Sequence, residues 1–99
     1  MTETLKAETG VFPTQNASKY LQQLCKHFAH KVEVDYDAET GKAALPPGPA
    51  ELHATDSDLT VRITGEDDAA LKVARYIIDS HLARFAFREN FETMDWQAV

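Results

Sequence analysis

Cysteine is almost absent from this sequence, as are several features that place a protein in a broad class. A single cysteine, Cys25, among 99 residues excludes a disulfide framework. No apolar run approaches the ~20 residues needed to cross a bilayer. The amino-terminal segment has neither a basic start nor an apolar core, so no signal peptide is predicted. We therefore expect a protein of the reducing cytoplasm with no membrane partner.

Positive charge is also scarce. Ten lysines and arginines stand against sixteen aspartates and glutamates, which gives a formal net charge of −6. Phosphate backbones attract basic domains, so this balance argues against general DNA or RNA binding. The sequence also lacks a P-loop, a dinucleotide-binding fingerprint and a G-x-S-x-G motif. We therefore expect a binding domain without a cofactor rather than an enzyme, and no nucleic-acid partner.

The composition that remains is that of one small globular domain. Hydrophobic residues make up 43% of the chain and charged residues 26%, which are ordinary values for a soluble fold. A chain of this size buries roughly two-thirds of its unfolded surface, enough for one modest core. We expect a single domain over residues 1–99, with its core within about 5–96.

Alternating apolar and polar residues predict the strands, with the apolar positions of each facing the core. Such alternation covers residues 5–11, 32–36, 50–54 and 59–63, and a short return strand is expected over 43–45. The opposite face of the sheet should then present polar side chains to solvent. These are Glu33, Asp35, Glu51, His53, Thr60 and Arg62.

Glycine and proline indicate where the strands turn. Gly41 closes the expected hairpin loop that begins at Asp37, where a glycine is free to take a positive φ angle. The run Pro46-Pro47-Gly48-Pro49 should lie outside the sheet, because proline cannot donate a ladder hydrogen bond.

Two segments repeat apolar residues with the helical period. The first runs to about His30, and its core stripe is Ala17, Tyr20, Leu21, Leu24 and Phe28. The second is capped by Thr64, ends near Arg88, and has an apolar face of Leu71, Ala74, Ile78, Leu82 and Phe85. The order of elements predicts an α+β fold of two layers, with both helices packed on one face of a mostly antiparallel sheet.

Cys25-x-His27-x-x-His30 has the residue types of a metal site but not the geometry. On a helix, Cys25 and His27 flank opposite sides of the core stripe and cannot hold one ion. His27 and His30 are neighbours, but two imidazoles leave zinc short of ligands. We therefore expect no metal centre here, and Cys25 is interpreted as a small hydrophobic residue at the edge of the core.

Basic residues border the core stripes of both helices. Residues 18–31 hold three lysines and no acid, and residues 69–88 hold four cations against Asp79, so each segment has a local charge of +3. Two guanidiniums can bind a carboxylate or phosphate through paired hydrogen bonds. The alternative is a solvated charged face, with His81 as a histidine at the core edge. The candidate ligand-binding residues are Lys26, His27, His30, His81, Arg84 and Arg88.

The stretches over residues 20–31 and 81–89 together resemble the motifs of a small bacterial family, domain of unknown function 2218. The resemblance extends from about Ala7 to Trp96. It implies a TBP-like fold, meaning a curved antiparallel sheet that carries two helices. It also implies a link to iron acquisition, through siderophore-interacting flavin reductases fused to or encoded beside such domains. The resemblance implies no catalytic residues.

Three hypotheses about function follow. The first is a non-enzymatic module accessory to ferric-siderophore utilisation, which binds an anionic small molecule or a siderophore-interacting reductase. The second is a metal or haem protein that uses His27, His30 or His81. The third is a structural domain that forms a homodimer through the open sheet face or the carboxyl-terminal tail. The first requires the two basic segments to lie side by side over a common core.

Overall fold

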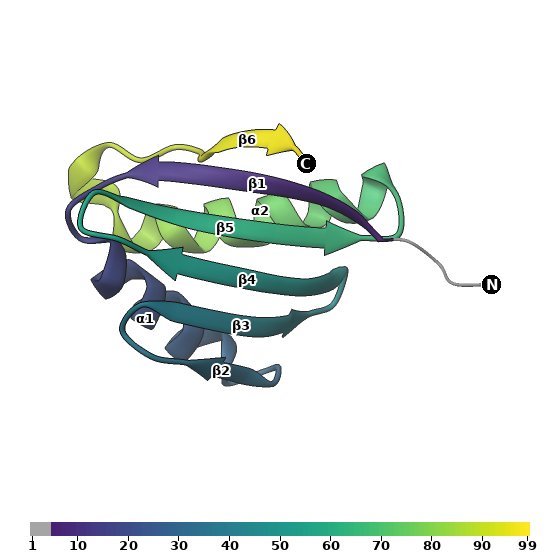
Figure 1. The fold of residues 1–99 in the computed structure, drawn as a ribbon, viewed down its shortest axis with the longest axis horizontal. Coiled ribbons are helices and arrows are strands. Elements are labelled where there is room, and N and C mark those ends of the chain that lie inside the picture. Colours follow the sequence, from purple (N-terminus) through teal and green to yellow (C-terminus); the bar gives the residue numbers. More distant parts are fainter. Residues whose placement is uncertain (1–4) are drawn as a thin grey trace.

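The computed structural model describes residues 5–99, which form a six-stranded sheet with two helices on one face (Figure 1). The elements are β1 (Lys6–Pro13), α1 (Ala17–Phe28), β2 (Val34–Tyr36), β3 (Thr40–Leu45), β4 (Gly48–Ala54), β5 (Asp58–Gly65), α2 (Asp68–Phe85), the 3-10 turn η1 (Phe87–Glu89) and β6 (Asp95–Ala98). Neighbouring strands are antiparallel, in the order β2-β3-β4-β5-β1-β6. The predicted two-layer α+β class is confirmed, and the finer TBP-like label stays a prediction. No helix within residues 5–99 is long and apolar enough to cross a membrane.

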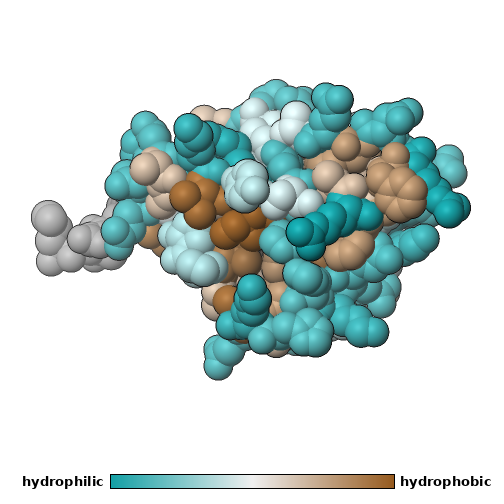
Figure 2. Space-filling model, turned by 180° about the vertical axis from the view of Figure 1, so that it is seen from behind, coloured by the Kyte–Doolittle hydropathy of each residue, from teal (hydrophilic) through white to brown (hydrophobic). Residues whose placement is uncertain are grey.

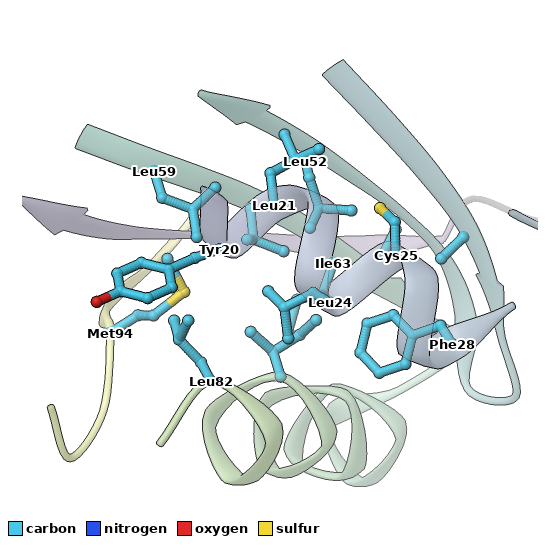
Figure 3. Close-up of a cluster of buried hydrophobic side chains, with 14 of the residues drawn as sticks. Tyr20, Leu21, Leu24, Cys25, Phe28, Leu52, Leu59, Ile63, Leu82 and Met94 are labelled. Atoms are coloured by element: carbon cyan, nitrogen blue, oxygen red, sulfur yellow. The ribbon is translucent and has the colours of Figure 1, made fainter. Parts of the chain in front are cut away.

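The core lies between the two helices and the inner face of the sheet. Figure 3 shows side chains of α1, α2 and the central strands meeting in one cluster. Both predicted helical stripes are buried, except that Phe85 is only partly covered. Burying one large aliphatic side chain contributes about 1.5–3 kcal/mol, so this cluster is the main source of stability. The outer face carries the predicted polar residues, and only Thr60 among them is half-buried.

The first strand presents the face opposite to the predicted one. Thr9 and Val11 lie opposite Arg62 and Thr60 in the ladder, so they share the outer face with those residues. Gly10 is buried on the inner side of β1. The apolar alternation of this strand is weak, because its inner positions include a glycine that another segment of the chain covers.

The predicted position of Gly41 at the end of a hairpin loop is wrong, and Gly41 does not use the positive φ open to glycine, since no glycine within residues 5–99 has one. Gly41 instead lies buried within β3, which begins earlier than predicted. A Cβ atom built on Gly41 would lie 2.8 Å from Sγ of Cys25. The missing side chain therefore lets α1 approach the sheet closely.

The run Pro46-Pro47-Gly48-Pro49 does not lie wholly outside the sheet as predicted. Gly48 and Pro49 begin β4 and pair with the end of β3. The ladder between β4 and β5 starts only at Glu51, so Pro49 does not need a backbone N–H on that side. The Thr64 hydroxyl donates a hydrogen bond of 2.6 Å to the Pro49 carbonyl in place of a ladder bond.

This use of Thr64 means that the predicted helix cap is also wrong. The N-cap of α2 is Asp67, whose carboxylate accepts a 2.8 Å hydrogen bond from the Ala70 amide. The helix ends at Phe85, so that Arg88 belongs to η1 rather than to α2. The chain leaves η1 through Asn90, whose φ of 56° is the left-handed conformation that asparagine tolerates.

The carboxyl-terminal segment is fastened to α2 through one carboxylate. Asp79 accepts hydrogen bonds from the Thr93 hydroxyl at 2.6 Å, the Met94 amide at 3.1 Å and Nε1 of Trp96 at 3.0 Å. β6 pairs with β1, and the Trp96 ring lies over Gly10. This segment docks on the body of the protein, with Phe91 buried and Trp96 half-buried.

We predict that Gly10→Ala destabilises the fold by displacing this tryptophan. A Cβ on Gly10 would lie 2.7 Å from a ring carbon of Trp96, closer than packing allows. The expected loss in free energy of unfolding is about 1–3 kcal/mol, the usual cost of overpacking. Urea unfolding followed by far-ultraviolet circular dichroism measures it, because this signal does not depend on Trp96, the single tryptophan. The same change in a Trp96→Ala background should cost much less, and an equal cost in both backgrounds would refute the contact.

Candidate functional site

The two basic segments meet where the second half of α1 crosses the carboxyl-terminal half of α2. The ring centroids of His27 and His81 are 4.7 Å apart, and those of Phe28 and His81 are 5.3 Å apart. His30 lies one turn further along, its ring 6.5 Å from that of His27. The expected side-by-side arrangement over a common core is therefore present in the structure.

His81 is held in one orientation by its own helix. Its Nδ1 atom lies 2.6 Å from the carbonyl oxygen of Ile77, and the side chain is half-buried. Because a carbonyl oxygen can only accept, Nδ1 carries the proton and donates. In the neutral ring Nε2 is then left as an acceptor, and in the charged ring it donates as well.

We call the contact between the helices along His27, His30, His81 and Arg84 the seam. His27 experiences the summed positive charge of this seam. Burial lowers the pKa of His27 below its ordinary value, and the neighbouring charges of His81, Arg84, His30 and Lys31 lower it further. A negatively charged ligand at this point would offset that repulsion. The seam is therefore a place where the protein's own charges favour an anion.

A cleft of about 450 Å³ continues the seam toward the start of α1 and the end of α2. It is lined by Asn16, Lys19, Tyr20, Gln23, Arg84, Phe85, Phe87, Arg88 and Glu89. Three cations against one carboxylate give this lining a formal charge of +2, in a chain whose net charge is −6. The Phe85 ring centroid lies 6.4 Å from that of His27, so the cleft and the histidine pair adjoin.

Gln23 contributes a polar atom without a partner. Its Oε1 atom is buried and accepts no hydrogen bond within the part of the chain that the structure describes. An unsatisfied buried acceptor costs about 1–3 kcal/mol, so a rotation of the amide that brings this oxygen to a ligand hydroxyl or N–H group would remove a standing penalty.

Glu89 fixes the far wall of the cleft. Its carboxylate accepts hydrogen bonds from the Thr14 hydroxyl at 2.7 Å, from Nδ2 of Asn16 at 3.3 Å and from the Tyr20 hydroxyl. The bond from Tyr20 is the main cause that lowers the pKa of Glu89, while burial followed by this carboxylate raises the pKa of Tyr20. Glu89 thus ties η1, and with it Arg88, to the beginning of α1.

The structure gathers most of the predicted site residues but not all of them. His27, His30, His81 and Arg84 lie along the seam. Arg88 lines the cleft, with its guanidinium carbon 5.6 Å from the centre of the Phe87 ring. Lys26 is exposed and does not line the cleft. Sequence reasoning missed Lys19 and Gln23, which precede His27 by two turns and one turn on the same flank of α1.

Cys25 lies on the other side of α1, as its position on the helix predicted. The side chain is fully buried, and burial raises the pKa of the thiol to about 11. Within residues 5–99, no group of three or more histidine, cysteine or acidic side chains is placed to hold a metal ion. The alternative of a metal centre built on the Cys25–His30 stretch thus lacks a ligand set in this region.

Comparison with known proteins agrees with the motif resemblance. The model of a bacterial family described as an uncharacterized protein conserved in bacteria, DUF2218, matches residues 9–97. This chain belongs to the DUF2218 family. A DUF2218 domain is therefore what the two helices and the sheet form, and both the cleft and the histidine pair lie inside the matched region.

A solved structure has the same fold as this DUF2218 domain. The NMR structure of PA4090 from Pseudomonas aeruginosa superimposes with a TM-score of 0.76 at 29% sequence identity, covering 93% of this chain and 95% of that one. No match is found among curated proteins.

We predict that His27 titrates below its ordinary pKa of 6.5. Because the folded pKa is depressed, the unfolded state binds the proton more readily. His27 should therefore contribute stability that is fully present above pH 6.5 and is lost as the pH falls toward the folded pKa. NMR titration of the imidazole signals measures the midpoint.

Arg84→Gln removes one repelling charge and should raise the His27 midpoint, whereas Arg62→Gln on the outer sheet face should not change it. A wild-type His27 midpoint at or above the ordinary pKa would show that the positive charges of the seam do not act on His27.

We predict that the Cys25 thiol is protected in the native DUF2218 domain. A thiol with a pKa of about 11 is almost fully protonated at pH 8, and this one is also shielded from solvent. Modification by an aromatic disulfide reagent should be slower by at least about a hundredfold than in urea, where the thiol pKa returns to its ordinary range. Rapid native-state labelling would contradict this placement of α1.

Proposed function

We propose that this DUF2218 domain is a non-enzymatic binding module for small anionic molecules, with its site in the α1–α2 cleft. The observation that carries the proposal is the gathering of Lys19, Arg84 and Arg88 on one cleft of an acidic protein, beside the unpaired amide oxygen of Gln23. A cleft of about 450 Å³ is of the size that small ligands occupy.

The lining indicates the kind of anion. The guanidiniums of Arg84 and Arg88 suit carboxylate, catecholate or phosphate oxygens, which they bind through paired N–H donors. Phe85 and Phe87 add aromatic surface on which a planar group can stack. Gln23 accepts from a hydroxyl or N–H. The best ligand therefore combines negative charge, a flat apolar part and at least one hydrogen-bond donor.

Anionic ferric–siderophore complexes are the first ligands to test within this class. Many carry catecholate rings or carboxylates together with amide donors, and their negative charge suits a positive cleft. The motif resemblance, which implies a link to iron acquisition, supports the same choice. The partner proposed with it is a siderophore-interacting reductase, to which the domain would present its ligand.

We predict that such a ligand shifts the NMR signals of both helices. Titrations with catecholate and hydroxamate siderophores, loaded with diamagnetic gallium(III) in place of iron(III), should perturb the amides of Gln23, Arg84 and Phe85. Citrate, inorganic phosphate and haem are parallel titrations that separate a siderophore site from a general anion site or a haem site. A protein that shows no shifts along α1, α2 or η1 with any of these would refute the proposal.

Arg84→Gln and Arg88→Gln should each weaken binding roughly tenfold, since each removes a charged hydrogen-bond donor. Arg62→Gln is the matched control, because Arg62 is an exposed arginine on the opposite face of the molecule. Equal losses in all three variants would indicate non-specific attraction rather than a cleft.

A further inference from the structure

The outward side of α2 carries no charge along its centre. Its residues opposite the core position Ile78 follow the spacing of four and three that a helix needs to form a continuous stripe. They are Ala69, Val73, Tyr76, Ser80 and Ala83, with Phe87 of η1 continuing the line. The five residues of α2 lie within about 40° of the direction pointing away from the core. We call these six residues the α2 stripe.

The large members of the α2 stripe are conspicuously exposed. Tyr76 is 73% exposed, Phe87 63% and Val73 50%, and they make up half of the six large hydrophobic side chains exposed within residues 5–99. Figure 2 shows the helix-covered side of the molecule, with two apolar areas separated by paler and hydrophilic side chains. The corresponding side of α1 is an ordinary solvated face, because the exposed polar residues Gln22 and Lys26 occupy it.

Neither flank of α2 needs the stripe for folding. One flank is fastened to the sheet by the Arg75–Glu8 ion pair and to the carboxyl-terminal segment by Asp79. The other flank faces α1 through His81. The stripe lies between these contacts. Ala83 packs partly against the core, whereas the exposed Val73, Tyr76 and Phe87 contribute little to the stability of the single chain. An uncharged row of this length points to a partner that covers it.

We infer that the α2 stripe is the contact between two copies of this chain, with their α2 helices antiparallel about a two-fold axis beside residue 78. This arrangement sets every large residue of the stripe against a small one. Phe87 of one copy faces Ala69 of the other, Val73 faces Ala83, and Tyr76 faces Ser80. A two-fold interface repeats each of these pairs, so the six side chains fill one another's spaces without a gap or a clash between two large groups.

Charge supports the antiparallel direction. The chain at the start of α2 is acidic, with Glu66, Asp67 and Asp68. The end of α2 carries Arg84, and η1 after it carries Arg88 beside Glu89. Antiparallel pairing brings the acidic start of each helix to the basic end of the other, and it also opposes the two helix dipoles. Parallel pairing would place like charges together at both ends. Glu66 and Arg88 are the pair that this arrangement brings to the same margin of the stripe.

The contact is small. α2 is about 27 Å long, and one helical face buries less than the roughly 1,200 Å² of a stable complex. The dimer should therefore form and dissociate with concentration. Sedimentation velocity from micromolar to millimolar protein should show a monomer–dimer equilibrium.

Tyr76→Glu should weaken the dimer by at least about tenfold, because it removes a central aromatic group and buries a charge. Gln22→Glu on the solvated face of α1 is the control and should leave dimerisation unchanged. Glu66→Arg and Arg88→Glu should each weaken the dimer, and combining the two should restore it.

Cysteine cross-linking decides the direction of the helices. Mixed Val73→Cys and Ala83→Cys proteins should form a disulfide under mild oxidation, whereas either variant alone should not, since its two copies of the residue lie about 15 Å apart along the axis. Cys25 does not interfere, because it is fully buried. A strict monomer at millimolar concentration, a dimer unaffected by Tyr76→Glu, or self-cross-linking of Val73→Cys would each overturn the inference.

Discussion

The close approach of α1 to both the sheet and α2 is the constraint on which the rest of the structure depends. The absent side chain of Gly41 leaves the space that the Cys25 sulfur occupies, so that α1 lies directly on β3. Leu24 can then be fully buried between the sheet and α2. Apolar packing of this kind holds the register of α1, because interiors tolerate neither voids nor overlaps. That register sets the separation of the next outward residues, His27 and His81, at 4.7 Å between ring centres.

Hydrogen bonds to the Glu89 carboxylate add to this apolar packing. The chain leaves α2 and turns back through η1, and this turn is held by the Glu89 carboxylate with its donors Thr14, Asn16 and Tyr20. The donors all come from the end of β1 and the start of α1, so that one acidic side chain joins the two ends of the domain. The cleft is positive in spite of Glu89, because Lys19, Arg84 and Arg88 outnumber this one carboxylate.

Periodicity predicted the helical core and the juxtaposition of the two basic segments, because a 3.6-residue period states which face of a helix is buried. It did not predict the face of β1, where Gly10 is covered by Trp96 from the far end of the chain. The local sequence pattern of a strand contains no information about a distant side chain that packs on one of its glycines. The sequence did not identify Lys19 and Gln23 as site residues for the same reason. They line the cleft only because η1 turns back beside them, and the contacts of Glu89 with a distant part of the sequence hold η1 there.

The proposed cleft and the proposed dimer share Phe87 and Arg88, both residues of η1. If both are correct, the acidic start of a partner's α2 lies beside the same guanidinium that an anionic ligand would use. A ligand that neutralises Arg88 then removes part of the attraction between the copies. Thermodynamic linkage requires that dimerisation lowers the affinity for the ligand by the same factor. Tyr76 does not line the cleft, so a substitution there acts directly on dimerisation alone. The two events are therefore separable by substitution but opposed in solution, and the turn η1 after α2 is enough to couple them.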